Sequence, residues 1–131
     1  MMRRSTFRLP RHPTSVGLAR HRVRDHLEGW ERENETVESV VLVVSELATN
    51  AVRHSPLLER EFEVAVTIEA DGSCTVEVSD GAAHVRPVPR EAADGDESGR
   101  GLRLVEALSR NWGVRERGRD GKTVWAVLAS A

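Results

Sequence analysis

Apolar residues recur at helical spacing in two long segments of the first half of the chain. The first stripe comprises Val16, Ala19, Val23, Leu27 and Trp30, and the second comprises Val37, Val40, Val41, Val44, Leu47, Ala48, Ala51 and Val52. Spacings of three and four residues place each set on one face of a helix. We therefore predict one helix from about residue 13 to 30 and a second from about residue 36 to 54, after which Pro56 blocks continuation.

Apolar and polar residues then alternate in two short segments, which predicts two strands. Residues 62–68 and 74–80 have apolar side chains at nearly every second position, and Asp71-Gly72 between them is typical of a hairpin turn. Each strand has one apolar face and one polar face. We therefore expect a sheet that helices cover on one side only.

A long segment rich in glycine, proline and acidic residues, from residue 80 to 101, separates these elements from a third helix and a second hairpin. The helical stripe comprises Leu102, Val105, Leu108 and Trp112. The hairpin combines residues 114–117 and 123–128 around Asp120-Gly121. Together the elements predict an α/β chain of the α+β type, a two-layer sandwich with one core and one domain over residues 1–131.

Charge and cysteine content narrow the expected partners and location. The chain of 131 residues carries 19 Lys and Arg against 21 Asp and Glu, a formal net charge of −2, and the two signs are interspersed. This balance argues against direct binding of nucleic acid or an anionic membrane, and no apolar run approaches the ~20 residues that span a bilayer. The single cysteine, Cys74, excludes an internal disulfide and a thiolate-rich zinc site. Because residues 1–10 lack the apolar stretch of a secretory signal, we expect a cytoplasmic protein.

A row of polar residues interrupts the second predicted helix. Glu46 and Asn50 are four residues apart and Arg53 follows three residues later, so all three project from about one side. An ordinary solvated helix face is one interpretation. The functional interpretation is a carboxylate that accepts a proton beside an amide oxygen that binds Mg²⁺, a cation that prefers oxygen ligands.

Asp80 and a glycine-containing segment are further candidates for a site. Asp80 is in phase with the apolar residues of its strand and should point toward the covered face of the sheet. A carboxylate there needs a hydrogen-bond partner, such as an adenine amino group, whereas a turn at the strand end before Gly81 is the alternative. Gly99-Arg100-Gly101 stands at the start of the third predicted helix, where glycines and free amide groups suit a phosphate.

The segment Gly121-Lys122-Thr123 imitates the end of a P-loop. Glu116 occupies the position of the first P-loop glycine, and a strand rather than a helix follows. We therefore interpret the segment as a hairpin turn and expect phosphate binding to depend on arginine, backbone amides and Mg²⁺ rather than on Lys122.

Four segments, in order, resemble the motifs of the GHKL ATPase superfamily, which includes histidine kinases, Hsp90, gyrase B and MutL. They are residues 46–54 (ELATNAVRH), residues 76–80 (VEVSD), Gly99-Arg100-Gly101-Leu102, and Thr123 on the last strand. The single-domain length and Glu46 at the head of the first motif are similar to the anti-sigma-factor serine/threonine kinase branch in its stand-alone actinobacterial form. The resemblance covers the chain from about residue 7 to 128.

This resemblance implies a Bergerat-type fold, a mixed sheet with helices on one face and ATP held between them beneath a lid of about residues 81–98. It implies that Asn50 binds an Mg²⁺ ion bridging the phosphates, that Glu46 is the general base, and that Arg53 lies near the phosphates. The remaining implied roles are adenine binding by Asp80, phosphate binding by Gly99, Arg100, Gly101 and Leu102, and a position near the adenine for Thr123.

Two functions follow from the resemblance. The first is a kinase that transfers the γ-phosphoryl group of ATP to a Ser or Thr of an anti-sigma-factor antagonist, with Mg²⁺ as cofactor. The alternative is a non-catalytic module of the same fold that sequesters a sigma factor or the antagonist with weak or no dependence on nucleotide. Ala82 and His84, which replace two glycines of the family's adenine motif, motivate the alternative. Dimerisation is common in the branch, which leaves a homodimer open.

Overall fold

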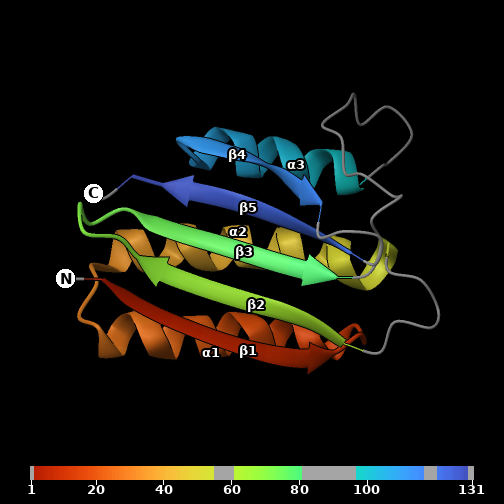
Figure 1. Cartoon of the computed structure of the whole chain (residues 1–131), viewed down its shortest axis with the longest axis horizontal. Coiled ribbons are helices and arrows are strands. Elements are labelled where there is room, and N and C mark those ends of the chain that lie inside the picture. Colours follow the sequence, from red (N-terminus) through yellow and green to blue (C-terminus); the bar gives the residue numbers. More distant parts are fainter. Residues whose placement is uncertain (1, 55–60, 81–96, 117–120, 130–131) are drawn as a thin grey trace.

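In the part of the chain that the structure describes, three helices cover one face of a five-stranded sheet (Figure 1). The computed structural model describes residues 2–54, 61–80, 97–116 and 121–129. In chain order the elements are β1 (Arg3–Pro10), α1 (Thr14–Gly29), α2 (Asn34–His54), β2 (Glu61–Ile68), β3 (Cys74–Asp80), α3 (Glu97–Leu108), β4 (Asn111–Glu116) and β5 (Lys122–Leu128). This arrangement confirms the predicted α+β sandwich with its helices on one face.

The strands follow the order β1-β2-β3-β5-β4, and each neighbouring pair is antiparallel. The resemblance implied a mixed sheet, and in the described strands every pairing is antiparallel instead. The hairpins β2–β3 and β4–β5 produce antiparallel neighbours directly. Between β3 and β5 the chain passes through α3 and β4, which return it so that β5 also runs antiparallel to β3.

α2 is the central helix of the helical layer. It packs against α1 and α3 within the layer and against β3 of the sheet. Its predicted apolar stripe is buried apart from the half-buried Val52, and Val43 outside the stripe is buried as well. Three neighbours cover more of the helix than one stripe requires, which explains this additional burial. None of the described helices combines the length and the apolarity needed to cross a membrane.

β1 is an edge strand that the sequence pattern did not predict. Phe7 and Leu9 pack against the core, and Arg4 and Arg8 alternate with them. The strand pairs with β2 from Arg3 opposite Ile68 to Pro10 opposite Glu61. With few apolar residues, its alternation is too weak to be recognised without the neighbouring strand, and its arginines are typical of a sheet edge.

Trp112 belongs to β4, although its spacing from Leu108 predicted a place in the third helix. α3 ends at Leu108, and Trp112 lies opposite Ala126 of β5 and packs against the core from the sheet. The next residue of β4, Gly113, has no room for a side chain, because a Cβ atom at that position would lie 2.9 Å from Cζ2 of Trp125. The helical spacing of Trp112 is therefore coincidental, and contacts between strands determine its position.

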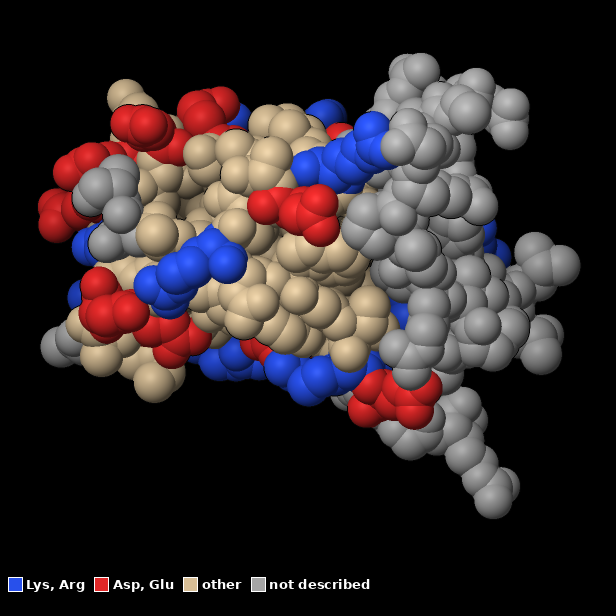
Figure 2. All heavy atoms as spheres, turned by 90° about the horizontal axis from the view of Figure 1, so that it is seen from above, with Lys and Arg blue, Asp and Glu red and all other residues tan. Residues whose placement is uncertain are grey.

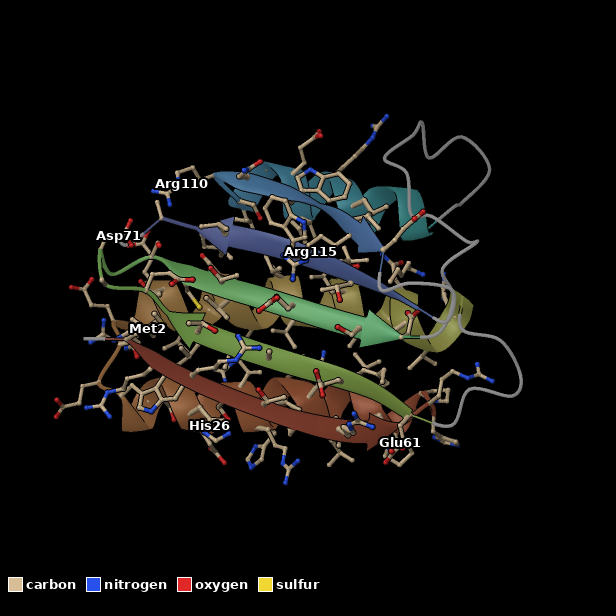
Figure 3. The ribbon with its side chains drawn as sticks, viewed as in Figure 1. Met2, His26, Glu61, Asp71, Arg110 and Arg115 are labelled. Atoms are coloured by element: carbon tan, nitrogen blue, oxygen red, sulfur yellow. The ribbon has the colours of Figure 1, made fainter. Side chains whose placement is uncertain are left out.

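The face of the sheet away from the helices carries a network of three charged residues. Arg4 of β1 and Arg115 of β4 both form ion pairs with Glu77 of β3. Figure 3 shows Arg115 on this face, in front of the sheet, with the helices behind it. Burial disfavours the ionised form of Glu77, but hydrogen bonds from the two guanidinium groups outweigh it and lower the pKa of the carboxyl group.

Glu77→Gln should reduce stability at neutral pH and remove part of its pH dependence. The pKa of Glu77 lies below its ordinary value of 4.5 in the folded protein. Its contribution is therefore complete above the unfolded-state pKa and is lost as the pH falls through the folded-state pKa. We expect a loss of about 1–2 kcal/mol at neutral pH that shrinks as the pH is lowered from about 5 to about 2, measured by urea unfolding.

The matched control for this prediction is Glu61→Gln, which changes an exposed carboxylate at the start of β2. It should leave the free energy of unfolding nearly unchanged. A Glu77→Gln deficit that stays constant down to the lowest pH would show that the ionisation of Glu77 does not stabilise the fold.

Candidate functional site

Four element ends gather at one end of the molecule, the right-hand end in Figure 1. They are the C-terminal ends of α2 and β3 and the N-terminal ends of α3 and β5. α2 packs against both α3 and β3, which brings the helical ends over this end of the sheet. The residues predicted from the sequence as site residues lie on these four elements, so the fold collects them in one region.

Asp80 ends β3 on the inner face of the sheet, as its phase along the strand predicted. The residue is 7% exposed. Its Oδ1 lies 3.5 Å from Nζ of Lys122, whose side chain is 2% exposed. A buried carboxylate requires a charged or hydrogen-bonding partner, and Lys122 supplies one. This environment favours a functional site at Asp80 over a simple turn at the end of the strand.

Lys122 is the residue of this region that the sequence interpretation missed. It begins β5 and pairs in register with Asp80 instead of lying in the hairpin turn. Burial lowers the pKa of its ammonium group, and the adjacent Asp80 carboxylate opposes that change. Strand parity was the available signal, because Val124, Ala126 and Leu128 face the core and residue 122 must share their face.

The same parity places Thr123 on the opposite face of the sheet from Asp80. Thr123 pairs in register with Ser79, and the two hydroxyl oxygens are 2.7 Å apart in a buried hydrogen bond. The structure therefore does not bring Thr123 to the Asp80 carboxylate. It brings Lys122 there.

The polar row of α2 is more buried than a solvated helix face. Asn50 is 4% exposed, Glu46 is half-buried and Arg53 is exposed. No described residue accepts a hydrogen bond from Nδ2 of Asn50, although buried amide groups normally have partners. Rotating the amide by half a turn exchanges its nitrogen and oxygen, so the side chain suits either a phosphate oxygen or a metal ion. Asn50 therefore fits the Mg²⁺ site that the resemblance implied.

α3 starts earlier than predicted, so the glycine-containing segment lies in its N-terminal turns. The helix spans Glu97–Leu108, and Leu102 is its first buried residue among those whose side chains are described. The first amide groups of a helix lack partners within the helix, and the helix dipole adds positive potential there. Gly99 belongs to this first turn, so an anion can bind at its amide group. Gly101 and Leu102 lie far enough along α3 for their amide groups to donate to the carbonyl groups of Glu97 and Ser98 instead.

Most of the expected lid falls outside the described part of the chain. Residues 81–96, which include Ala82 and His84, are not among the described residues. Glu97 and Ser98, which the expected lid also included, form the start of α3. The expected boundary of the lid at residue 98 therefore overlaps the helix.

One family model matches nearly the whole chain. This model, described as the histidine kinase-like ATPase domain, covers residues 9–128. The chain belongs to this family. The matched range includes all the site elements, from Glu46 on α2 to Lys122 on β5. Membership of the histidine kinase-like ATPase domain family implies ATP as the ligand of the fold. No protein of curated function matches the sequence significantly.

Solved structures share the histidine kinase-like fold. The RsbU and RsbW domains of Rv1364c from Mycobacterium tuberculosis align with a TM-score of 0.74 and 20% identity, over 98% of this chain and 32% of that one. The SiaB-SiaC complex from Pseudomonas aeruginosa aligns with a TM-score of 0.66 and 16% identity, over 95% of this chain and 88% of that one. The blue-light activated histidine kinase EL346 from Erythrobacter litoralis aligns with a TM-score of 0.54 and 26% identity, over 76% of this chain and 32% of that one. This chain thus spans about a third of the first of these chains, and the likeness establishes the fold.

Asp80→Asn should destabilise the protein by about 3 kcal/mol, because it leaves the buried Lys122 ammonium group beside a neutral amide. The double variant Asp80→Asn/Lys122→Met should recover most of this loss, since it removes both buried charges. Urea unfolding of the wild type and both variants measures the difference. A single variant as stable as the wild type, or a double variant less stable than the single one, would contradict the pairing of these two charges.

Proposed function

We propose that the protein is an ATP- and Mg²⁺-dependent serine/threonine kinase that phosphorylates an anti-sigma-factor antagonist. The observation that carries the proposal is a buried Asp80 carboxylate at the C-terminal end of β3 and a buried Asn50 amide near the C-terminal end of α2. These two element ends lie at the same end of the molecule (Figure 1). A carboxylate on the sheet and an amide on the helix suit a ligand with an amino group at one end and phosphates at the other. Membership of the histidine kinase-like ATPase domain family supports ATP as that ligand.

The base and the phosphates of ATP contact different elements in this proposal. Asp80 accepts a hydrogen bond from the adenine amino group on the inner face of the sheet. Asn50 would hold Mg²⁺ through its amide oxygen, while Arg53 and the N-terminal turns of α3, which contain Gly99 to Leu102, bind the phosphates. The ion, when bound, neutralises the negative charge of the phosphates. Thr123 lies on the opposite face of the sheet and has no place in this site.

Glu46 is the proposed general base. The oxygen of a substrate hydroxyl forms a bond to the γ-phosphorus while the bond from that phosphorus to the β–γ bridging oxygen breaks, and ADP leaves. The Glu46 carboxylate takes the proton of the hydroxyl group. Glu46 lies one helical turn before Asn50 on α2, so the helix holds the base at a constant distance from the amide that holds the metal.

The proposed client is a protein that docks on the ATP-binding domain itself, which we take as a single domain. A sigma factor or an anti-sigma-factor antagonist is the candidate client, and structures of the same fold include an RsbW domain and SiaB in a complex with SiaC. On the face seen in Figure 2, positive and negative side chains are interspersed with uncharged surface, which suits a protein client better than nucleic acid or an anionic membrane. The proposal includes a cytoplasmic location and is compatible with either a monomer or a homodimer.

The second candidate function is a non-catalytic module of the same fold that sequesters a sigma factor or the antagonist. The ion pair between Asp80 and Lys122 favours it, because the carboxylate assigned to adenine already has a charged partner within the protein. In this alternative Mg-ATP has weak or no effect on stability or client binding. The two functions are therefore separated by tests of nucleotide binding and phosphoryl transfer.

Mg-ATP should raise the midpoint of thermal unfolding of the wild type, because a ligand that binds only the folded state stabilises it by about 2.7 kcal/mol at about 100 times its Kd. Asn50→Ala should abolish this rise with little loss of stability in the absence of nucleotide, since Nδ2 makes no hydrogen bond to a described residue. Asn111→Ala, at an exposed position on β4, is the matched control and should keep the full rise. No response of the wild type to millimolar Mg-ATP would reject ATP binding and favour sequestration.

Glu46→Gln should retain the Mg-ATP stabilisation but transfer phosphate at least about 100-fold more slowly, since it removes the proton acceptor. The assay incubates the protein with γ-labelled ATP and purified anti-sigma-factor antagonists from the same genome. Glu106→Gln, at an exposed position on α3, is the control and should label at the wild-type rate. Equal labelling by Glu46→Gln would remove Glu46 from the mechanism, and no labelling by an ATP-binding wild type would favour the sequestering module.

A further inference from the structure

Lys122 is a buried cation to which the proposed function assigns no role. Its side chain is 2% exposed, and its Nζ lies 3.5 Å from Oδ1 of Asp80. Burial of an ammonium group is costly, and replacing a buried ion pair with apolar residues is often neutral or stabilising. The pair therefore indicates a role in the site rather than in stability alone.

Contacts on both faces of the sheet align the start of β5 with the end of β3. On the inner face Lys122 pairs with Asp80, and on the outer face the hydroxyl groups of Ser79 and Thr123 are 2.7 Å apart. Glu116 of β4 pairs in register with Lys122 from the other side. Directly opposed residues on neighbouring strands have their side chains on the same face. Lys122 thus lies on the inner face between two positions that carry carboxylates.

We propose that Lys122 is a positioning residue that holds the Asp80 carboxylate in the orientation that recognises the 6-amino group of a purine base. This inference rests on the proposed binding of ATP. A hydrogen bond weakens steeply when its angle departs from linearity, so the acceptor oxygen must face the amino group. A charged contact on Oδ1 restricts rotation of the carboxylate in the free protein. Nucleotide binding then loses less side-chain entropy, because the carboxylate is already ordered.

A residue with this role affects selectivity for the base and not the binding of the phosphates. ATP and purine riboside triphosphate differ only in the 6-amino group, so the ratio of their affinities measures that one contact. A hydrogen bond to a charged group corresponds to about 10-fold to 100-fold in affinity. We expect the wild type to prefer ATP by this factor, and we expect the ratio for Lys122→Met to fall toward about 1.

Isothermal titration calorimetry of both nucleotides in excess Mg²⁺ measures this ratio for the wild type and the variants. Lys122→Arg keeps a positive charge near Asp80 and should restore most of the preference for ATP. Ser79→Ala is the matched control, because it removes the contact on the outer face and leaves the inner pair in place. A merely structural role of Lys122 would weaken both nucleotides equally and leave the ratio unchanged.

A wild-type ratio retained by folded Lys122→Met overturns the inference. If circular dichroism shows that Lys122→Met does not fold, Lys122→Ala, which also removes the donor, is titrated in its place and the same criterion applies. Equal binding of the two nucleotides by the wild type also overturns the inference, because Asp80 then does not recognise the amino group. Failure of the wild type to bind either nucleotide is a different result, and it removes the proposed function together with the inference.

Discussion

The register between β3 and β5 is the constraint on which both the core and the candidate site depend. It sets Val76 opposite Ala126 and Val78 opposite Val124, on the face that packs against α2, and it ends with Asp80 opposite Lys122. Because strand side chains alternate, a slip of one residue would turn one strand's core residues to the outer face and separate the ion pair. Burial of these valines therefore determines where the charged residues of the site meet.

The strongly periodic parts of the fold could be predicted from the sequence. α1, α2, β2 and β3 each bury a stripe or an alternating face that is visible in the residues themselves. β1 and Trp112 could not be predicted this way, because their positions depend on neighbouring strands rather than on their own pattern. β1 becomes a strand only beside β2, and Trp112 is held in the sheet opposite Ala126. In both cases tertiary contacts outweighed local spacing.

The candidate site was predictable to a similar extent. Helical spacing identified the polar row that contains Asn50, and strand phase correctly placed Asp80 on the covered face. Lys122 was missed because its neighbours imitate a P-loop, and once that motif is rejected the segment is interpreted as a hairpin turn, which assigns no role to the lysine. Strand parity would have placed Lys122 on the inner face, but its pairing with Asp80 requires the order of strands in the sheet. Parity would also have kept Thr123 away from the site.

Buried polar groups are concentrated where the proposed ligand binds, at a cost in stability. Asn50, Asp80 and Lys122 occupy buried positions that apolar residues would fill more favourably, a pattern typical of functional sites. The most direct measurement is a crystal structure with Mg²⁺ and a non-hydrolysable ATP analogue. We predict the adenine amino nitrogen at about 3 Å from the Asp80 carboxylate, with the phosphates between Asn50 and the start of α3. A nucleotide bound elsewhere, or with its amino group turned away from Asp80, would contradict this account.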